Sequence, residues 1–359
     1  MQFSKIGSIF LYFCVYINSS LCLYGCSKAK NKCISRALYF LAMSSVVILS
    51  SIRYNVGTDY PSYVAIYEGA RYMSFLQYIK NYSILSTPIL PFLFMKIAGM
   101  FDCVNIFFLL FSIVIYIPTS IVILKHRNTC SIFLASFAFL TTSFTIGFNI
   151  MKQIAAVSIG LFAMQFIIER RPIKFSISVF IACCFHPTAV VLFPLYFLVR
   201  GRNNVRISWI YLFIIVIGSV MLLYMYPLVL KAMGGRFAEY VNYGGVTNNY
   251  SLVLSILLLM IFIGFRHRLS CLDSKTRLYI TIFFIGVLFE SLGFSSPFVK
   301  RISLYFSAVS MILVPSIATI LISKYGKVVC LCFFAYYIAI FVLDFYVFEH
   351  SNIIPFIVR

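Results

Sequence analysis

The chain has 359 residues, of which 62% are apolar and 11% are charged, and its mean hydropathy of +1.00 excludes an ordinary soluble globular protein. Its formal charge of +20 at pH 7 does not indicate a nucleic-acid partner, because the cations lie between apolar runs rather than along one face. The eleven cysteines form neither a disulfide framework nor a CxxC zinc pattern. The composition is that of a multi-spanning membrane protein.

Apolar runs of about 20 residues recur from end to end, which is the length that a helix needs to cross about 30 Å of hydrocarbon. They predict an all-α polytopic integral membrane protein with about ten full transmembrane helices and two broken or re-entrant segments. We expect one polytopic domain over residues 1–359 with both termini outside. Residues 6–26 predict the first span rather than a signal peptide, because no small-residue cleavage site is evident.

Six short connecting segments carry clusters of Lys and Arg, and the positive-inside rule places them in the cytoplasm. These segments are 28–36, 125–127, 170–174, 200–206, 266–277 and 324–327. Eleven cations remain, and topology alone does not explain them. They are Lys5, Arg53, Arg71, Lys80, Lys96, Lys152, Lys231, Arg236, Lys300, Arg301 and Arg359.

Two apolar runs do not fit a simple in-and-out count. Residues 84–101 are interrupted by two prolines and a lysine, and residues 175–199 have cytoplasmic cations at both ends and "FHPT" near the middle. A segment that enters the membrane and returns, bent at Pro187 in the second case, satisfies these flanks. The alternative is that both are ordinary spans and that one or two basic loops violate the rule.

Two outer segments are long enough to carry structure, namely 53–83 and 231–249. The first predicts a turn at "NVGTDYP" followed by an aromatic, amphipathic stretch in the membrane interface. Its tyrosines, Tyr60, Tyr63 and Tyr67, are suited to anchoring at the headgroup level or to stacking on sugar rings. The second contains two glycine pairs, which would let a loop move over a site.

The unusual polar residues converge on the outer side in this topology. Arg53 and Asp59 follow the second span, Lys152 and Gln153 open a later span, and His186 lies at the tip of the predicted hairpin. Arg236 lies in the second outer segment, and Arg301 opens a late span. The cations indicate an anionic ligand, and guanidinium groups suit a diphosphate because they offer a planar, bidentate fork.

Asp59 and His186 are the candidate catalytic groups. Asp59 is either a turn or helix-cap residue or a general base held beside Arg53. His186 lies within an apolar segment, where it is either a satisfied structural residue or, as an ionisable side chain inside the membrane, a functional one. The chain has no P-loop, DxD pair, GxSxG elbow or histidine cluster. We therefore expect a preactivated donor, no metal and no cofactor.

Four segments resemble a known family. "SIRYNVGTDYPSY" is similar to the R-x-x-V-G-T-D-Y-x-x-Y segment of EpsG-type membrane proteins, which are related in role to the Wzy polysaccharide polymerases. "MKQIAAVSIGLF" resembles their R-Q-x-I-A element, with Lys152 in place of arginine, so that the charge is kept and the fork is lost. "ACCFHPTAVVLFPLYF" resembles A-x-x-F-H-x-[ST]-A, and "KRISLYFS" resembles R-x-x-x-Y, which adds Tyr305 to the candidate substrate-binding residues.

The resemblance implies a polymerase in the bacterial inner membrane that joins undecaprenyl-diphosphate-linked oligosaccharide repeat units at the periplasmic face. Its product would be an O-antigen, a capsule or an exopolysaccharide, with a chain-length regulator protein as a further partner beside membrane lipid. A GT-C-like arrangement of the spans is one option. Two rival functions stay open: a lipid-linked oligosaccharide flippase, and a membrane acyltransferase that modifies the glycan.

Overall fold

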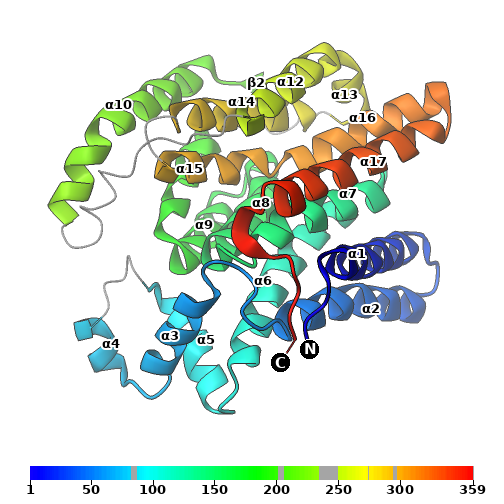
Figure 1. Ribbon diagram of the computed structural model, residues 1–359. Coiled ribbons are helices and arrows are strands. Elements are labelled where there is room, and N and C mark those ends of the chain that lie inside the picture. Colours follow the sequence, from blue (N-terminus) through cyan, green and yellow to red (C-terminus); the bar gives the residue numbers. More distant parts are fainter. Residues whose placement is uncertain (82–86, 201–205, 234–249, 274, 294–296, 359) are drawn as a thin grey trace. The chain divides into compact units, whose positions relative to one another are not determined.

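The computed structural model describes residues 1–81, 87–200, 206–233, 250–273, 275–293 and 297–358 (Figure 1). The described residues are almost entirely helical, and their chain contacts divide them into two compact units. Unit 1 comprises Met1–Phe162, Phe180–Ala189 and Val314–Arg359, and unit 2 comprises Ala163–Val179 and Val190–Leu313. Most of the outer segment 231–249 lies outside the described residues.

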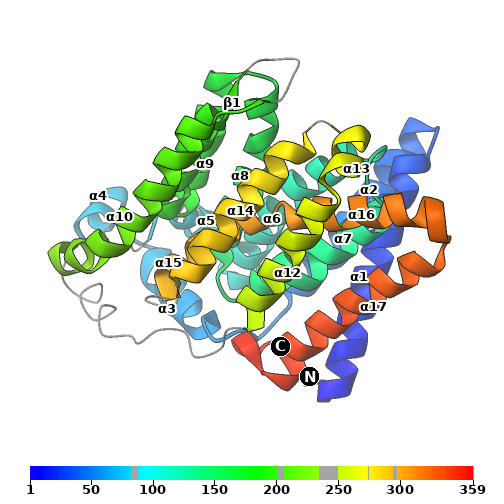
Figure 2. The ribbon, with the colours of Figure 1, turned by 90° about the horizontal axis from the view of Figure 1, so that it is seen from above.

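The helices of unit 1 include most of the long apolar ones. They are α1 (Lys5–Lys28), α2 (Lys32–Ser51), α3 (Tyr60–Ala70), α4 (Phe75–Asn81), α5 (Ile89–Gly99), α6 (Val104–Lys125), α7 (Ile132–Phe139) with a π-helical turn at Leu140–Phe144, the first part of α8 (Met151–Ile168), most of α16 (Ser310–Tyr325), and α17 (Val328–Val342) with its π-helical extension Leu343–Val347. Figure 2 shows α17 beside α1, where the ring of Phe341 meets those of Phe13 and Tyr16.

Unit 2 contains most of the remaining helices and the one strand pair of the described residues. These elements are the first part of α9 (Pro172–Phe185), a 3₁₀ helix at Pro187–Leu198, strands β1 (Val199–Arg200) and β2 (Arg206–Ile207), α10 (Trp209–Met233), α12 (Tyr250–Gly264), α13 (Arg266–Leu272), α14 (Thr276–Leu292) and α15 (Pro297–Ser307).

Helices α2 and α6 lie antiparallel. The Oγ of Ser112 donates to the Oγ of Ser50 at 2.6 Å near the end of α2, and the hydroxyls of Tyr39 and Ser120 are 2.8 Å apart near its beginning. The basic segments 28–36 and 125–127 therefore share one end of unit 1. The loop that follows α2 lies at the opposite end, together with the beginning of α6, as the charge pattern predicted.

The C-terminal segment 351–358 binds to the same end of unit 1. It pairs with the N-terminus through a bridge between Gln2 and Ile357, and the backbone N–H of Tyr54 donates to the carbonyl of Ile357 at 2.8 Å. The two ends of the chain consequently lie side by side (Figure 1). This arrangement agrees with termini on one side of the membrane.

The number of spans is the part of the expected fold that is not confirmed. Five helices among the described residues are long and apolar enough to cross a membrane, or up to seven if each of two bent helix pairs counts as one span. Further apolar helices of 10–17 residues are present. Several apolar runs that hydropathy merges into one span are thus divided into shorter helices.

The predicted turn of the chain near Pro187 is confirmed. Helix α9 ends at Phe185, and the 3₁₀ helix begins at Pro187. The chain then returns, because the rings of Phe175 and Tyr196 lie 5.4 Å apart and the Arg170 guanidinium donates to the carbonyl of Val199. The other interrupted run forms α5, whose 11 residues extend only about 16 Å.

The tyrosines of α3 correct the expectation for residues 53–83. Tyr60, Tyr63 and Tyr67 are between 1% and 5% exposed, because they recur on one face of α3 that packs on α6. The Tyr60 ring stacks on Phe108, and Tyr67 meets Phe107. These rings form protein core, so they neither anchor the chain in the headgroup layer nor offer a face to a sugar.

Replacing Phe356 by alanine tests the packing of the C-terminal segment. The side chain is fully buried, and its ring lies 5.5 Å from that of Tyr12. We expect Phe356→Ala to cost about 3 to 5 kcal/mol of folding free energy and to lower the thermal midpoint of the purified protein. Phe348→Ala is the matched control, because that ring is 43% exposed. Equal midpoints for the two variants would contradict the docking of this segment.

Candidate functional site

Arg53 is enclosed by aromatic rings directly after α2. Its Cζ lies 4.4 Å from the centroid of the Phe108 ring and 4.7 Å from that of Phe148. Its Nη1 donates to the carbonyl oxygen of Ser50 at 2.7 Å and to the Oγ of Ser50 at 2.6 Å. The guanidinium thus joins the end of α2 to α6 and to the chain before α8.

The burial of Arg53 corrects its expected place at the membrane surface. The residue is 2% exposed, no carboxylate among the described residues pairs with it, and its surroundings leave no room for a water molecule. Burial lowers the pKa of Arg53 to about 10, so the side chain is still a cation at neutral pH. Its donors serve the protein interior, and in this arrangement they do not reach a ligand.

The loop between α2 and α3 has a backbone that its sequence favours. Asn55 and Gly57 adopt φ angles of 51° and 102°. A Cβ atom at position 57 would lie 3.0 Å from the carbonyl oxygen of Phe148, so glycine permits both the φ angle and the close approach. On its other side, the N–H groups of Gly57 and Thr58 donate to the carbonyls of Asn352 and Ser351, each at 3.1 Å.

Asn149 connects this loop to the beginning of α8. Its Oδ1 accepts hydrogen bonds from the Oγ1 of Thr58 and from the backbone N–H of Asp59, both at 2.7 Å. Two segments that lie 90 residues apart in the sequence are joined in this way. The sequence interpretation missed Asn149, because its only visible signal was a place shortly before a predicted helix.

The ionisable residues Asp59 and Lys152 are partly exposed in this region. The side chain of Asp59 makes no capping hydrogen bond to α3, so the helix-cap alternative is wrong. The Nζ of Lys152 lies 5.8 Å from the ring centroid of Tyr63, one turn after Asp59 on α3. Gln153 is only 3% exposed and faces the interior. The loop and the "MKQ" element are therefore neighbours in unit 1.

Helix α6 extends the same region toward His186. The Phe111 ring lies 5.1 Å from Phe107, which contacts α3, and 5.8 Å from Phe185. His186 follows Phe185 directly and is partly exposed, and its Nδ1 is 2.6 Å from the Oγ1 of Thr188. One aromatic face of α6 thus supports both the Asp59 loop and the segment that carries His186.

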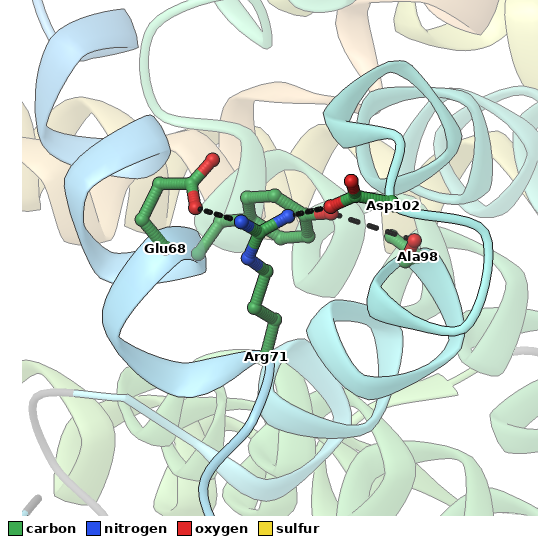
Figure 3. A network of polar contacts seen from close by, with 5 residues as sticks. Glu68, Arg71, Ala98 and Asp102 are labelled. Carbon is green, nitrogen blue, oxygen red and sulfur yellow. Dashed lines mark hydrogen bonds and ion pairs between the residues drawn. The ribbon is translucent and has the colours of Figure 1, made fainter.

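Arg71 and Lys96, two of the eleven unexplained cations, hold the end of α3 in place, and Figure 3 shows the contacts of Arg71. Arg71 forms ion pairs with Glu68 at 2.8 Å and with Asp102, just before α6. The Nζ of Lys96 donates to the carbonyls of Arg71 and Met73 at 2.7 and 3.1 Å. These cations therefore have structural partners that are close in space but lie up to 31 residues away in the sequence.

The remaining candidates belong to unit 2 or lie outside the described residues. Arg301 and Tyr305 both lie on α15, which packs closely on α14, since an added Cβ at Gly286 would lie 3.1 Å from the Cβ of Phe306. Arg301 is exposed, whereas Tyr305 is fully buried. Arg236 lies outside the described residues. Arg301 thus has the exposure that the sequence predicted for it.

The contrast between Arg53 and Arg301 is testable. We expect Arg53→Ala to lower the free energy of unfolding by about 2 to 4 kcal/mol, because it leaves a cavity between two rings and removes the donors to Ser50. Arg301→Ala should change it by less than about 0.5 kcal/mol, because the side chain is exposed. The thermal midpoints of the purified variants measure this difference. A midpoint of Arg53→Ala equal to that of the wild type would contradict the enclosed position.

Comparison with known proteins agrees with the resemblance of the four sequence segments. No curated protein and no solved structure matches the chain. The EpsG family matches residues 36–358, a range that includes the Asp59 loop, Asn149, His186 and the C-terminal segment as far as Val358. Because the match covers most of the sequence, and because those segments meet in unit 1, this chain belongs to the EpsG family.

Proposed function

We propose that this chain is a glycosyltransferase that joins lipid-linked oligosaccharide repeat units into a surface polysaccharide. Membership of the EpsG family points to a polysaccharide polymerase, and the apolar helices indicate a membrane protein. The donor in this proposal is an oligosaccharide carried on undecaprenyl diphosphate. The product is an O-antigen, a capsule or an exopolysaccharide.

The observation that carries the proposal is the contact, at one end of unit 1, between the two elements that carry Asp59 and Lys152. Asp59 comes from the loop after α2 and Lys152 from the first turn of α8, and Asn149 connects the two elements. Both lie at the end opposite the basic segments 28–36 and 125–127. If those segments are cytoplasmic, the site faces the periplasm of a bacterial inner membrane.

The reaction needs a base and a cation, and these residues supply both. The bond from the anomeric carbon of the growing glycan to its diphosphate breaks, and the diphosphate leaves with the electron pair. A hydroxyl of the next lipid-linked unit forms the new glycosidic bond and gives its proton to Asp59 or His186. In unit 1, Lys152 is the cation proposed for the developing diphosphate charge, and Arg301 is a separate substrate-binding proposal in unit 2.

Arg53 has a supporting role in this proposal. Its guanidinium holds the beginning of the loop that carries Asp59, through a hydrogen bond to the Ser50 carbonyl and a cation–π contact with the Phe148 ring. Gln153 is buried as well, and we assign it a supporting role in unit 1, whereas the buried Tyr305 supports α15 in unit 2. The groups that meet the substrate are then the exposed or partly exposed ones.

Reconstitution of the purified protein in liposomes with its lipid-diphosphate-linked repeat unit tests this function. We expect the wild type to form a ladder of glycan lengths on a gel. Loss of the base should slow elongation by about 100-fold or more, so either Asp59→Asn or His186→Ala should lose the ladder. Glu349→Gln and His267→Ala are the matched controls, because both side chains are exposed and lie outside the proposed site. A wild type without a ladder would contradict the polymerase function and favour a flippase or an acyltransferase.

A further inference from the structure

We propose that Asn149 is a positioning residue that fixes the Asp59 carboxylate for proton transfer. This inference rests on the proposed function, in which Asp59 and His186 are the two candidate bases, and it takes Asp59 as the group that accepts the proton of the attacking hydroxyl. It concerns a residue outside the four segments that carry the family resemblance. The observation behind it is the pair of hydrogen bonds that one side-chain oxygen accepts from two consecutive residues.

The Oδ1 of Asn149 holds the loop at its last two residues before α3. Thr58 donates through its hydroxyl and Asp59 through its backbone N–H, each at 2.7 Å. Asp59 starts α3 without a capping bond from its own side chain, so Asn149 takes up an N–H group at the beginning of this helix. Asn149 therefore fixes the backbone of the residue that carries the carboxylate.

The rest of the loop is already fixed on other sides. Gly57 lies against the carbonyl of Phe148, and Thr58 donates its backbone N–H to Ser351 at 3.1 Å. Loss of the Asn149 side chain would therefore shift the end of the loop rather than unfold it. A displacement of about 1 Å at a catalytic group can cost about 100-fold in rate, because proton transfer needs hydrogen-bond reach.

An asparagine suits this position better than an aspartate. Both hydrogen bonds use the side-chain oxygen as an acceptor, so an aspartate could accept the same bonds. It would also place a negative charge beside Asp59, and a nearby like charge raises the pKa of a carboxyl group. The neutral amide provides the geometry without that shift.

Other ionisable groups surround the loop and are unchanged in the test. They are Arg53 and Tyr54 from the loop, Tyr60 and Tyr63 from α3 and Lys152 from α8, whereas the C-terminal segment 351–358, which contacts the loop, carries no ionisable side chain. Because these groups are common to the wild type and the variants, the difference between two pH profiles reports the charge at position 149.

The experiment measures elongation against pH for Asn149→Ala and Asn149→Asp, beside the wild type and Asp59→Asn. We expect Asn149→Ala to lower kcat about 100-fold with little change in KM. Asn149→Asp should recover kcat to within about tenfold of the wild type, with the acidic limb of its pH profile raised by about one unit. Asp59→Asn should abolish that limb. Thermal midpoints show whether Asn149→Ala is folded, and the pH shift of Asn149→Asp tests the inference even if it is not.

Asn31→Asp is the matched control. Asn31 caps α2 in the same manner, with Oδ1 accepting from the N–H of Cys33 at 2.8 Å, at the far end of a helix of 20 residues. The new charge there lies about 30 Å from the loop, so its pH profile should equal that of the wild type.

Two results would overturn the inference. One is a kcat of Asn149→Ala equal to that of the wild type, and the other is an Asn149→Asp profile that coincides with the wild-type profile. Failure of the proposed function looks different, because then the wild type and Asn31→Asp would form no polymer at any pH. That outcome would overturn the positioning role as well.

Discussion

The enclosed guanidinium of Arg53 is the interaction on which the site depends. Moving a cation out of water is costly, and the protein offsets this cost with two aromatic faces and with charge-assisted hydrogen bonds to Ser50. A desolvated cation–π contact contributes about 2 kcal/mol, and a planar guanidinium fits between two rings where an ammonium does not. Because Ser50, Phe108 and Phe148 come from three elements, one side chain sets where α2, α6 and the approach to α8 meet. The Asp59 loop begins at this point.

Much of this arrangement follows from local sequence signals. Hydropathy predicts the helical membrane architecture, and the positive-inside rule separates the basic segments from the end that carries Asp59 and Lys152. The turn at Pro187 is predictable because a proline, a histidine and two cationic flanks lie within one short run. The burial of Arg53 and of Tyr60 is not predictable in this way, because it depends on phenylalanines of α6 that lie about 50 residues further on. The prediction of about ten spans is not confirmed for a related reason. Hydropathy treats each apolar run as one complete span, whereas tertiary packing allows such a run to form shorter helices.

A cationic side chain in this protein does not by itself indicate a ligand-binding site. A guanidinium or ammonium outside the six basic segments can serve the protein itself, as Arg71 does through Glu68 and Asp102 and as Lys96 does through two backbone carbonyls. Two of those partners lie 25 or more residues away in the sequence, so a count of charged residues cannot identify them. Lys152 is partly exposed and Arg301 is exposed. The proposed site therefore contains fewer cations than the sequence pattern alone suggests. It also includes Asn149, which is a neutral residue.

A structure of the protein in a lipid bilayer with a bound polyprenyl diphosphate tests the central claim most directly. The account predicts the diphosphate near Asp59 and Lys152, at the end of unit 1 away from residues 28–36 and 125–127, with Arg53 still enclosed by Phe108 and Phe148. A diphosphate bound directly to the Arg53 guanidinium, or at the end with the basic segments, would contradict it.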